Sequence, residues 1–146
     1  MGSPLYMKGG FVSELSDDVI AAASAHATDG PAGGDCSLSF WAQGGAIGRV
    51  PDNAAAFAGR TAGWSVSTEA MWDDSAHDQA HMAWARRAMG TLKPFTTVGQ
   101  YVNDAVDADV ASVRAIYGNE KYDRLVGLKR KYDPDNVFRL NANIRP

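Results

Sequence analysis

The stretch from Gly63 to Leu92 reads GWSVSTEAMWDDSAHDQAHMAWARRAMGTL and joins two hydrophobic patterns. Residues 63–72 alternate between apolar and polar side chains, which is typical of a strand. Asp73 or Asp74 can then cap a helix, because a short acidic side chain accepts hydrogen bonds from the first free amides. The apolar stripe of that helix repeats every four residues: Ala80, Trp84, Ala88 and Leu92. The stretch therefore predicts a strand followed by an amphipathic helix.

The two faces of the predicted strand differ in polarity, and this difference predicts how it packs. The more apolar face consists of Val66, Thr68, Ala70 and Trp72. The more polar face consists of Ser65, Ser67, Glu69 and Met71. We expect the first face to pack on helices, and the second either to line a site or to face solvent.

Further elements are predicted upstream of this unit. Met7–Val12 favours a strand, and Ser16 can cap a helix that ends at Asp29. Cys36–Gln43 favours another strand, and Ala46–Val50 could be its hairpin partner. This order predicts an α+β fold, an antiparallel sheet with helices on one face.

The last third of the chain reads differently. Apolar residues from Val106 to Tyr117 predict a helix that ends at Gly118. Asn119 can cap a further helix, whose basic C-terminal residues 129–131 read as a solvated helix end. The turn residues 133–136 stop it, so the fold closes with a C-terminal helical segment and a short tail.

Composition excludes several function classes. The chain has 146 residues, 45% hydrophobic and 21% charged, which fits one globular domain. A net charge of -3 gives no electrostatic reason to expect nucleic acid or an anionic membrane as partner. No apolar run approaches the roughly 20 residues of a membrane span, and no signal-peptide stretch is evident. A single cysteine, Cys36, favours a reduced, cytoplasmic compartment and reads as a strand or core residue.

Two histidines invite a metal interpretation. His77 and His81 are four residues apart, so a helix places them on one face. Asp78 stands where a metalloprotease motif has Glu, and no third ligand is evident. We therefore predict no metal, and an exposed helix surface at these histidines.

The tail, Asn119 to Pro146, reads NEKYDRLVGLKRKYDPDNVFRLNANIRP. Its order of Tyr, Arg-Leu, Leu-Lys, Tyr-Asp-Pro-x-Asn-x-Phe and a closing Asn-Ile resembles the terminal signature of flavin-dependent oxidoreductases of the berberine-bridge-enzyme type. Tyr101-Val102-Asn103 resembles the Tyr-x-Asn element of that family. Trp72-Asp73, and the run from Gly44 to Phe57, resemble further landmarks in the same order.

The resemblance implies a partial protein with FAD as cofactor. It makes residues 1–100 a partial substrate domain and residues 101–146 the C-terminal segment, without the flavin-binding domain. The implied reaction is oxidation of an alcohol, a sugar or a secondary metabolite. The implied partners are a small-molecule substrate and either a flavin-binding domain or a second copy, through the open sheet face.

The same resemblance implies roles for individual residues. Tyr101 is the candidate base and Asn103 a cofactor contact; alternatively, Tyr101 begins a buried strand and Asn103 caps the next helix. Asn141 and Asn143 are candidate cofactor contacts, or else part of a plain surface tail. The polar strand face contributes candidate substrate contacts: Ser65, Ser67 and Glu69.

Two departures from the family pattern support a rival hypothesis. Gly59 stands where the family often has His, and Asp104 follows Asn103 where the family usually has an aromatic residue or His. A carboxylate there opposes the ionisation of a nearby phenol. The rival is a cofactor-free α+β module that binds a small molecule or forms oligomers.

Overall fold

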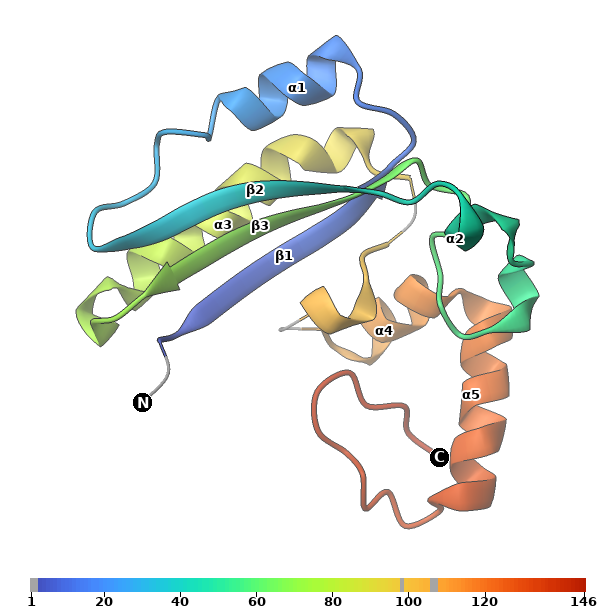
Figure 1. Cartoon of the computed structure of the whole chain (residues 1–146). Helices are drawn as coiled ribbons and strands as arrows, with labels where there is room; N and C mark the ends of the chain where they lie inside the picture. Colours follow the sequence, from blue (N-terminus) through green and yellow to red (C-terminus); the bar gives the residue numbers. More distant parts are fainter. Residues whose placement is uncertain (1–2, 98, 106–107) are drawn as a thin grey trace.

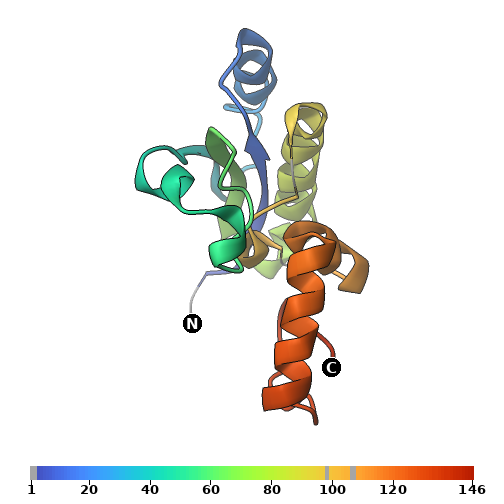
Figure 2. The ribbon, with the colours of Figure 1, turned by 90° about the vertical axis from the view of Figure 1, so that its right-hand side faces the viewer.

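The computed structural model describes residues 3–97, 99–105 and 108–146. Its central element is a three-stranded antiparallel sheet in the order β1-β3-β2. The strands are β1 (Leu5–Val12), β2 (Gly34–Ala42) and β3 (Trp64–Trp72). Helices α1 (Asp17–Ser24) and α3 (Asp78–Leu92) pack against the sheet, with α3 behind the strands in Figure 1 and beside them in Figure 2. The predicted α+β class is confirmed.

The core forms where the apolar face of β3 meets the two helices. Val66, Thr68 and Ala70 have no exposed surface, as predicted for that face. One cluster joins Val66 to Leu92 of α3 and to two residues of α1, Val19 and Ala23. Ser16 caps α1 as expected, because its hydroxyl accepts from the amide of Val19 at 3.3 Å.

A partly exposed hydrogen-bond network links the segment after α1 to α3. Asp29 accepts from the indole of Trp84 at 2.7 Å and from Arg87 at 3.3 Å. His26 contacts Asp29 through Nδ1 at 3.0 Å and Thr91 through Nε2 at 2.9 Å. The helix that we predicted to end at Asp29 ends at Ser24 instead, and Asp29 lies beyond it, where it links this segment to α3.

Two predictions for the first two thirds of the chain are wrong. Ala46–Val50 is not a strand: α2 (Ala46–Arg49) stands there, because β2 pairs with β3 along its whole length. His81 is not exposed but fully buried, with its ring stacked on Trp72 at 5.1 Å. Trp84, Ala88 and Leu92 of the predicted helical stripe are buried, which confirms that part of the prediction, but Ala80 is exposed. The buried face also includes His81 and Ala85.

The C-terminal third projects from the sheet (Figures 1 and 2). It contains α4 (Val110–Tyr117) and α5 (Asn119–Tyr132), separated by Gly118 as predicted. Asn119 is the first residue of α5 rather than its cap, and Val106, which we placed in the preceding helix, lies outside the described residues. Short 3-10 turns precede them at η1 (Asp52–Ala54), η2 (Ser75–His77), η3 (Lys93–Phe95) and η4 (Val102–Asp104).

Candidate functional site

The turn η4 brings together the two residues of the Tyr-x-Asn element. The side-chain amide of Asn103 donates a hydrogen bond to the hydroxyl of Tyr101 at 2.8 Å. Tyr101 is 38% exposed and lies outside any strand, so the alternative of a buried strand at this position is wrong. Because the phenol oxygen accepts from Asn103, its own proton remains available to another acceptor.

A cavity of about 470 Å³ opens beside this pair. Asn103 from η4 and Asn141 from the tail both line it, with Tyr117 of α4 between them in sequence. The structure therefore brings two of the three candidate cofactor contacts to one cavity, although 38 residues separate them in the chain. Burial, followed by the neighbouring Tyr101, raises the pKa of the Tyr117 phenol. Sequence patterning had marked Tyr117 only as a residue at the end of a helix.

The tail backbone forms a tight turn at Asn141. Asn141 adopts a positive φ of 58° and its carbonyl accepts from the amide of Asn143 at 2.8 Å. The side-chain oxygen of Asn143 is buried and has no hydrogen-bond partner in the part of the chain that the structure describes. A buried amide oxygen without a partner is costly. Asn143 does not line the cavity, whereas the amides of Asn103 and Asn141 do, and amide groups can both donate to and accept from the polar edge of a flavin.

The ring of Tyr101 rests on a loop between β2 and β3. Phe57 contacts Tyr101 with ring centroids 5.8 Å apart and contacts Phe11 of β1 at 6.3 Å. Gly59 has a φ of 89°, and a Cβ there would lie only 2.6 Å from the ring of Phe11. At the position where the family often has His, this chain therefore fills the space with Phe11.

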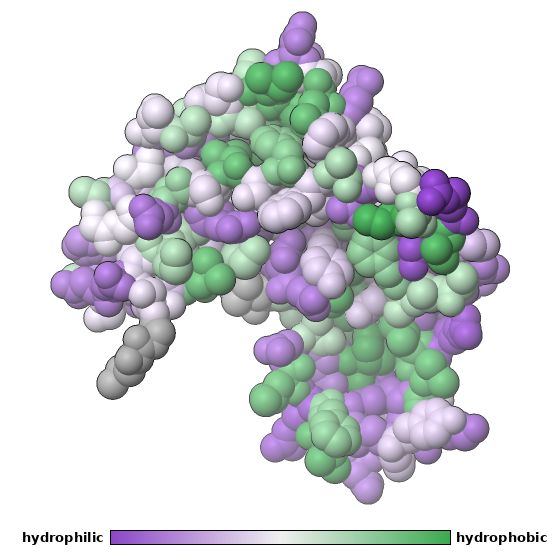
Figure 3. Space-filling model, in the orientation of Figure 1, coloured by the Kyte–Doolittle hydropathy of each residue, from purple (hydrophilic) through white to green (hydrophobic). Residues whose placement is uncertain are grey.

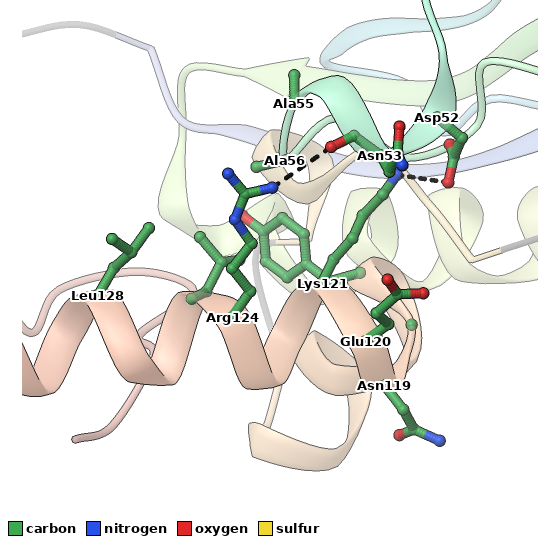
Figure 4. A pocket seen from close by; sticks show the side chains of 12 residues that line it. Asp52, Asn53, Ala55, Ala56, Asn119, Glu120, Lys121, Arg124 and Leu128 are labelled. Carbon is green, nitrogen blue, oxygen red and sulfur yellow. Dashed lines mark hydrogen bonds and ion pairs between the residues drawn. The ribbon is translucent and has the colours of Figure 1, made fainter.

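Helix α5 holds that loop in place (Figure 4). Lys121 donates to the carbonyl of Phe57 at 3.0 Å and pairs with Asp52 at 2.8 Å, while Arg124 donates to the carbonyl of Asn53 at 3.4 Å. A cavity of about 450 Å³ lies between the loop and α5. Lys121 thus connects the C-terminal segment through Phe57 to Tyr101.

The three polar residues of β3 face away from the helices. Ser67 is buried and donates to a carboxylate oxygen of Glu69 at 2.7 Å, whereas Ser65 and Glu69 are partly exposed. Asp104 is adjacent to this group: a Cβ added to Gly9, the cross-strand partner of Ser67, would meet the Asp104 carboxylate at 2.6 Å. Burial, followed by the charge of Glu69, raises the pKa of Asp104. The open sheet face and the Tyr101 site are therefore contiguous.

At the basic end of α5, Arg130 and Lys131 are exposed as predicted, whereas Lys129 is not. Lys129 is only 12% exposed, since it pairs with Asp133 and donates to the carbonyl of Phe138. Asp133 also accepts from the amides of Val137 and Phe138 at 2.7 and 3.1 Å. The hydrogen bond from Lys129 holds the pKa of Asp133 below its ordinary value. The turn it forms displays large apolar residues: Tyr132, Val137, Phe138 and Leu140 are each at least 70% exposed.

A family model described as "Berberine and berberine like" matches residues 100–145, the segment that carries Tyr101, Asn103 and the tail. The chain corresponds to the C-terminal portion of a berberine-bridge-like FAD-linked oxidoreductase. Among curated proteins, it is 32% identical over 114 residues to the uncharacterized FAD-linked oxidoreductase YvdP of Bacillus subtilis, covering 78% of this chain and 25% of YvdP. It is 31% identical over 127 residues to an aclacinomycin-N/aclacinomycin-A oxidase of Streptomyces galilaeus, covering 75% and 23%.

The same family relation is found in the fold. The crystal structure of an aclacinomycin oxidoreductase superposes with a TM-score of 0.80 and 27% identity, over 97% of this chain and 32% of that one. The chain thus spans about a quarter of the curated relatives it matches and about a third of the solved structure. In the described residues, no helix is both long and apolar enough to cross a membrane, and no three metal-binding side chains are grouped.

Proposed function

We propose that this chain is the substrate-side, C-terminal part of an FAD-dependent enzyme that oxidises an alcohol, a sugar or a secondary metabolite. The observation that carries the proposal is the Asn103–Tyr101 hydrogen bond beside a cavity that Asn141 also lines. A bound flavin would supply a hydride acceptor. Tyr101, after its own proton has left to solvent, takes as phenolate the proton that the substrate hydroxyl loses, and Asn103 donates to the phenolate oxygen and fixes its orientation.

The remaining candidates have further roles in this proposal. Asn103, Asn141 and Asn143 hold the polar edge of the ring through amide groups, which both donate and accept. Ser65, Ser67 and Glu69 contact the substrate from the open sheet face. This assignment divides the chain into residues 1–100, a partial substrate domain, and residues 101–146, the segment that returns to the flavin-binding domain.

The exposed apolar turn supports a partner surface. Phe138 and Leu140 are 81% and 85% exposed, and hydrophobic patches are visible over the lower part of the molecule in Figure 3. Clustered apolar residues of this size at a surface mark interaction sites. The partner we propose is the flavin-binding domain, with self-association as the alternative when that domain is absent.

The first test of the proposal is a titration of the purified 146-residue chain with FAD, in which flavin fluorescence and visible absorbance are the signals measured. Weak or absent binding by the chain alone, and restored binding after it is joined to a relative's flavin-binding domain, is the expected result. A joined protein that binds FAD but oxidises none of a panel of alcohols, sugars and ring metabolites would contradict it. The rival is a cofactor-free binding module. It is favoured by Asp104 and Gly59, and is supported if the chain binds a small molecule without flavin.

A further inference from the structure

A groove of about 490 Å³ lies between β1, α3 and α4, on the helix-covered side of the sheet. It shares no lining residue with the cavity beside Asn103. Glycines from three segments contribute to its lining: Gly10 of β1, Gly90 of α3 and Gly99 before η4. The groove is therefore a second concave surface, built from elements that the proposed function leaves without a role.

Gly90 differs from the other two glycines. A Cβ on Gly10 would meet the methyl group of Met89 at 2.8 Å, and one on Gly99 would meet the Cα of Ile116 at 3.1 Å. Packing thus explains both of these glycines. A Cβ on Gly90 would meet no atom of the described residues within 4 Å, although glycine weakens the interior of a helix relative to alanine. What glycine provides at this position of α3 is an open groove.

Within the described ranges, the charged side chains that line the groove are all cationic: Lys8, Arg86 and Lys93. Arg86 donates to the hydroxyl of Tyr6 at 2.9 Å, and the ammonium group of Lys8 lies 5.5 Å from the centre of the same ring, so both cations have contacts of their own. Lys93, at the end of α3, is exposed, and its ammonium group has no hydrogen bond or ion pair with any residue that the structure describes. Lys93 is therefore the cation that is available to a ligand.

Two carboxylates lie close to the groove but do not line it. Asp109 caps α4 and accepts from the amide of Ser112 at 2.7 Å. Asp104 lies beside Gly9, whose cross-strand partner Ser67 belongs to the strand face turned away from the helices. Asp104 is thus on the opposite side of β1, because successive residues of a strand point to opposite faces.

We propose that this groove binds a small organic anion, a carboxylate carried by an apolar ring system. The carboxylate pairs with Lys93, and the ring system lies over Gly90, between the apolar side chains of Met89 and Ile116. A concave, mostly apolar surface of this volume with few polar groups is the usual form of a small-molecule site. Charge complementarity favours a carboxylate over an alcohol or an amine, and the apolar walls favour it over an inorganic anion. This site goes beyond the proposed function and needs no flavin.

The test is a calorimetric titration of the full chain with naphthalene-2-carboxylate. Gly90→Leu fills the groove and should weaken binding about tenfold or more, whereas Ala83→Leu, at an exposed position of the same helix, should leave it unchanged. Lys93→Glu reverses the charge beside the ligand and should weaken binding several-fold. Lys131→Glu makes the same charge change on α5, away from the groove, and is its control.

Ala115→Trp narrows the groove from its α4 side and replaces Gly90→Leu as the test if that variant does not fold. No saturable binding by the wild type, or equal affinity in a folded groove-filling variant, overturns the proposal. Naphthalene-2-methanol, which has the same ring system without the charge, should bind several-fold more weakly than the carboxylate. Equal affinity for the two probes, or equal affinity of Lys93→Glu and Lys131→Glu for the carboxylate, overturns the assignment of an anionic ligand.

Discussion

The amide of Asn103 lies 2.8 Å from the hydroxyl of Tyr101. Tyr101 is the extended residue that precedes the 3-10 turn, and Asn103 lies within the turn. The contact orders the phenol without burying it. It depends on the turn, which the Phe57 ring supports from the opposite loop.

Tyr101→Phe should abolish most activity and leave the fold intact. Loss of a general base typically lowers kcat by about 10²–10⁴-fold, while a side chain that is 38% exposed contributes little to stability. Steady-state kinetics and flavin absorbance of the joined protein are the measurements. Tyr132→Phe, at a more exposed tyrosine of α5, is the control. Unchanged kcat in Tyr101→Phe would mean that another group accepts the proton.

Lys121→Met should loosen the loop that supports Tyr101. The substitution removes the hydrogen bond to the Phe57 carbonyl and the ion pair with Asp52. We expect a loss of roughly 1 kcal/mol in the free energy of unfolding and faster amide exchange in residues 52–57. Arg130→Met is the matched control, since Arg130 is exposed on the same helix. Equal amide exchange rates of residues 52–57 in both variants would show that Lys121 does not hold the loop against α5.

Thr68→Val should destabilise the sheet. The Thr68 hydroxyl is fully buried and donates to the carbonyl of Ala85 at 3.0 Å, so valine leaves a buried acceptor without that donor. The expected cost is about 1–3 kcal/mol in a urea denaturation experiment. Thr61→Val, at an exposed threonine, should be close to neutral. Equal stability of the two variants would show that the Ala85 contact contributes nothing.

Acid should weaken the attachment of α1 to α3. Burial alone would raise the pKa of Asp29, but hydrogen bonds from Trp84, His26 and Arg87 outweigh it and hold the pKa below the ordinary value of 3.8. A carboxyl with a lowered folded-state pKa stabilises the protein above its unfolded pKa and loses that contribution as pH falls through the folded value.

Asp29→Asn should therefore flatten the acid side of the stability curve. Denaturation midpoints measured between about pH 2 and pH 6 test this. Asp135→Asn, at an exposed position after α5, is the charge-matched control. The expectation fails if Asp29→Asn and the wild type lose stability in parallel over that range.

Phe138→Ser should reduce association without reducing stability. Phe138 is 81% exposed, so serine removes apolar surface and few internal contacts. Sedimentation should show weaker self-association of the chain, and the joined protein should retain FAD less well. Ile20→Ser, at a half-exposed residue of α1, is the control. If the wild-type chain sediments as a monomer at high concentration, it does not self-associate, and that alternative is contradicted.

The sequence predicted those elements whose pattern depends on one packing face. The alternation in β3 placed Val66 and Thr68 against the helices, and Ser16 capped α1 through a local contact that neighbouring residues fully determine. The prediction of a strand at Ala46–Val50 was wrong because β2 pairs with β3 instead, and that pairing depends on residues distant in sequence. The prediction that His81 is exposed was wrong because a polar side chain can be buried when an aromatic neighbour such as Trp72 covers it.

The residues of the candidate site come from the resemblance and their roles stay predictions, while their arrangement could not be predicted from the sequence. Resemblance singled out Tyr101, Asn103 and Asn141, yet no local pattern could show that a tail residue and a turn residue share a cavity. Asp104 was expected to disturb the site through its charge. Its proximity to Gly9 and Glu69 became visible only when β1 and β3 were paired.

The close approach of Phe11 to Gly59 has a consequence for how related sequences change. A side chain at position 59 and a large ring at position 11 compete for the same volume, and the φ of 89° favours glycine as well. The two positions should therefore covary across homologues, with a bulky residue at one accompanied by a small residue at the other. A lineage that replaces Gly59 with His must first shorten Phe11, so the order of the two substitutions is constrained during divergence.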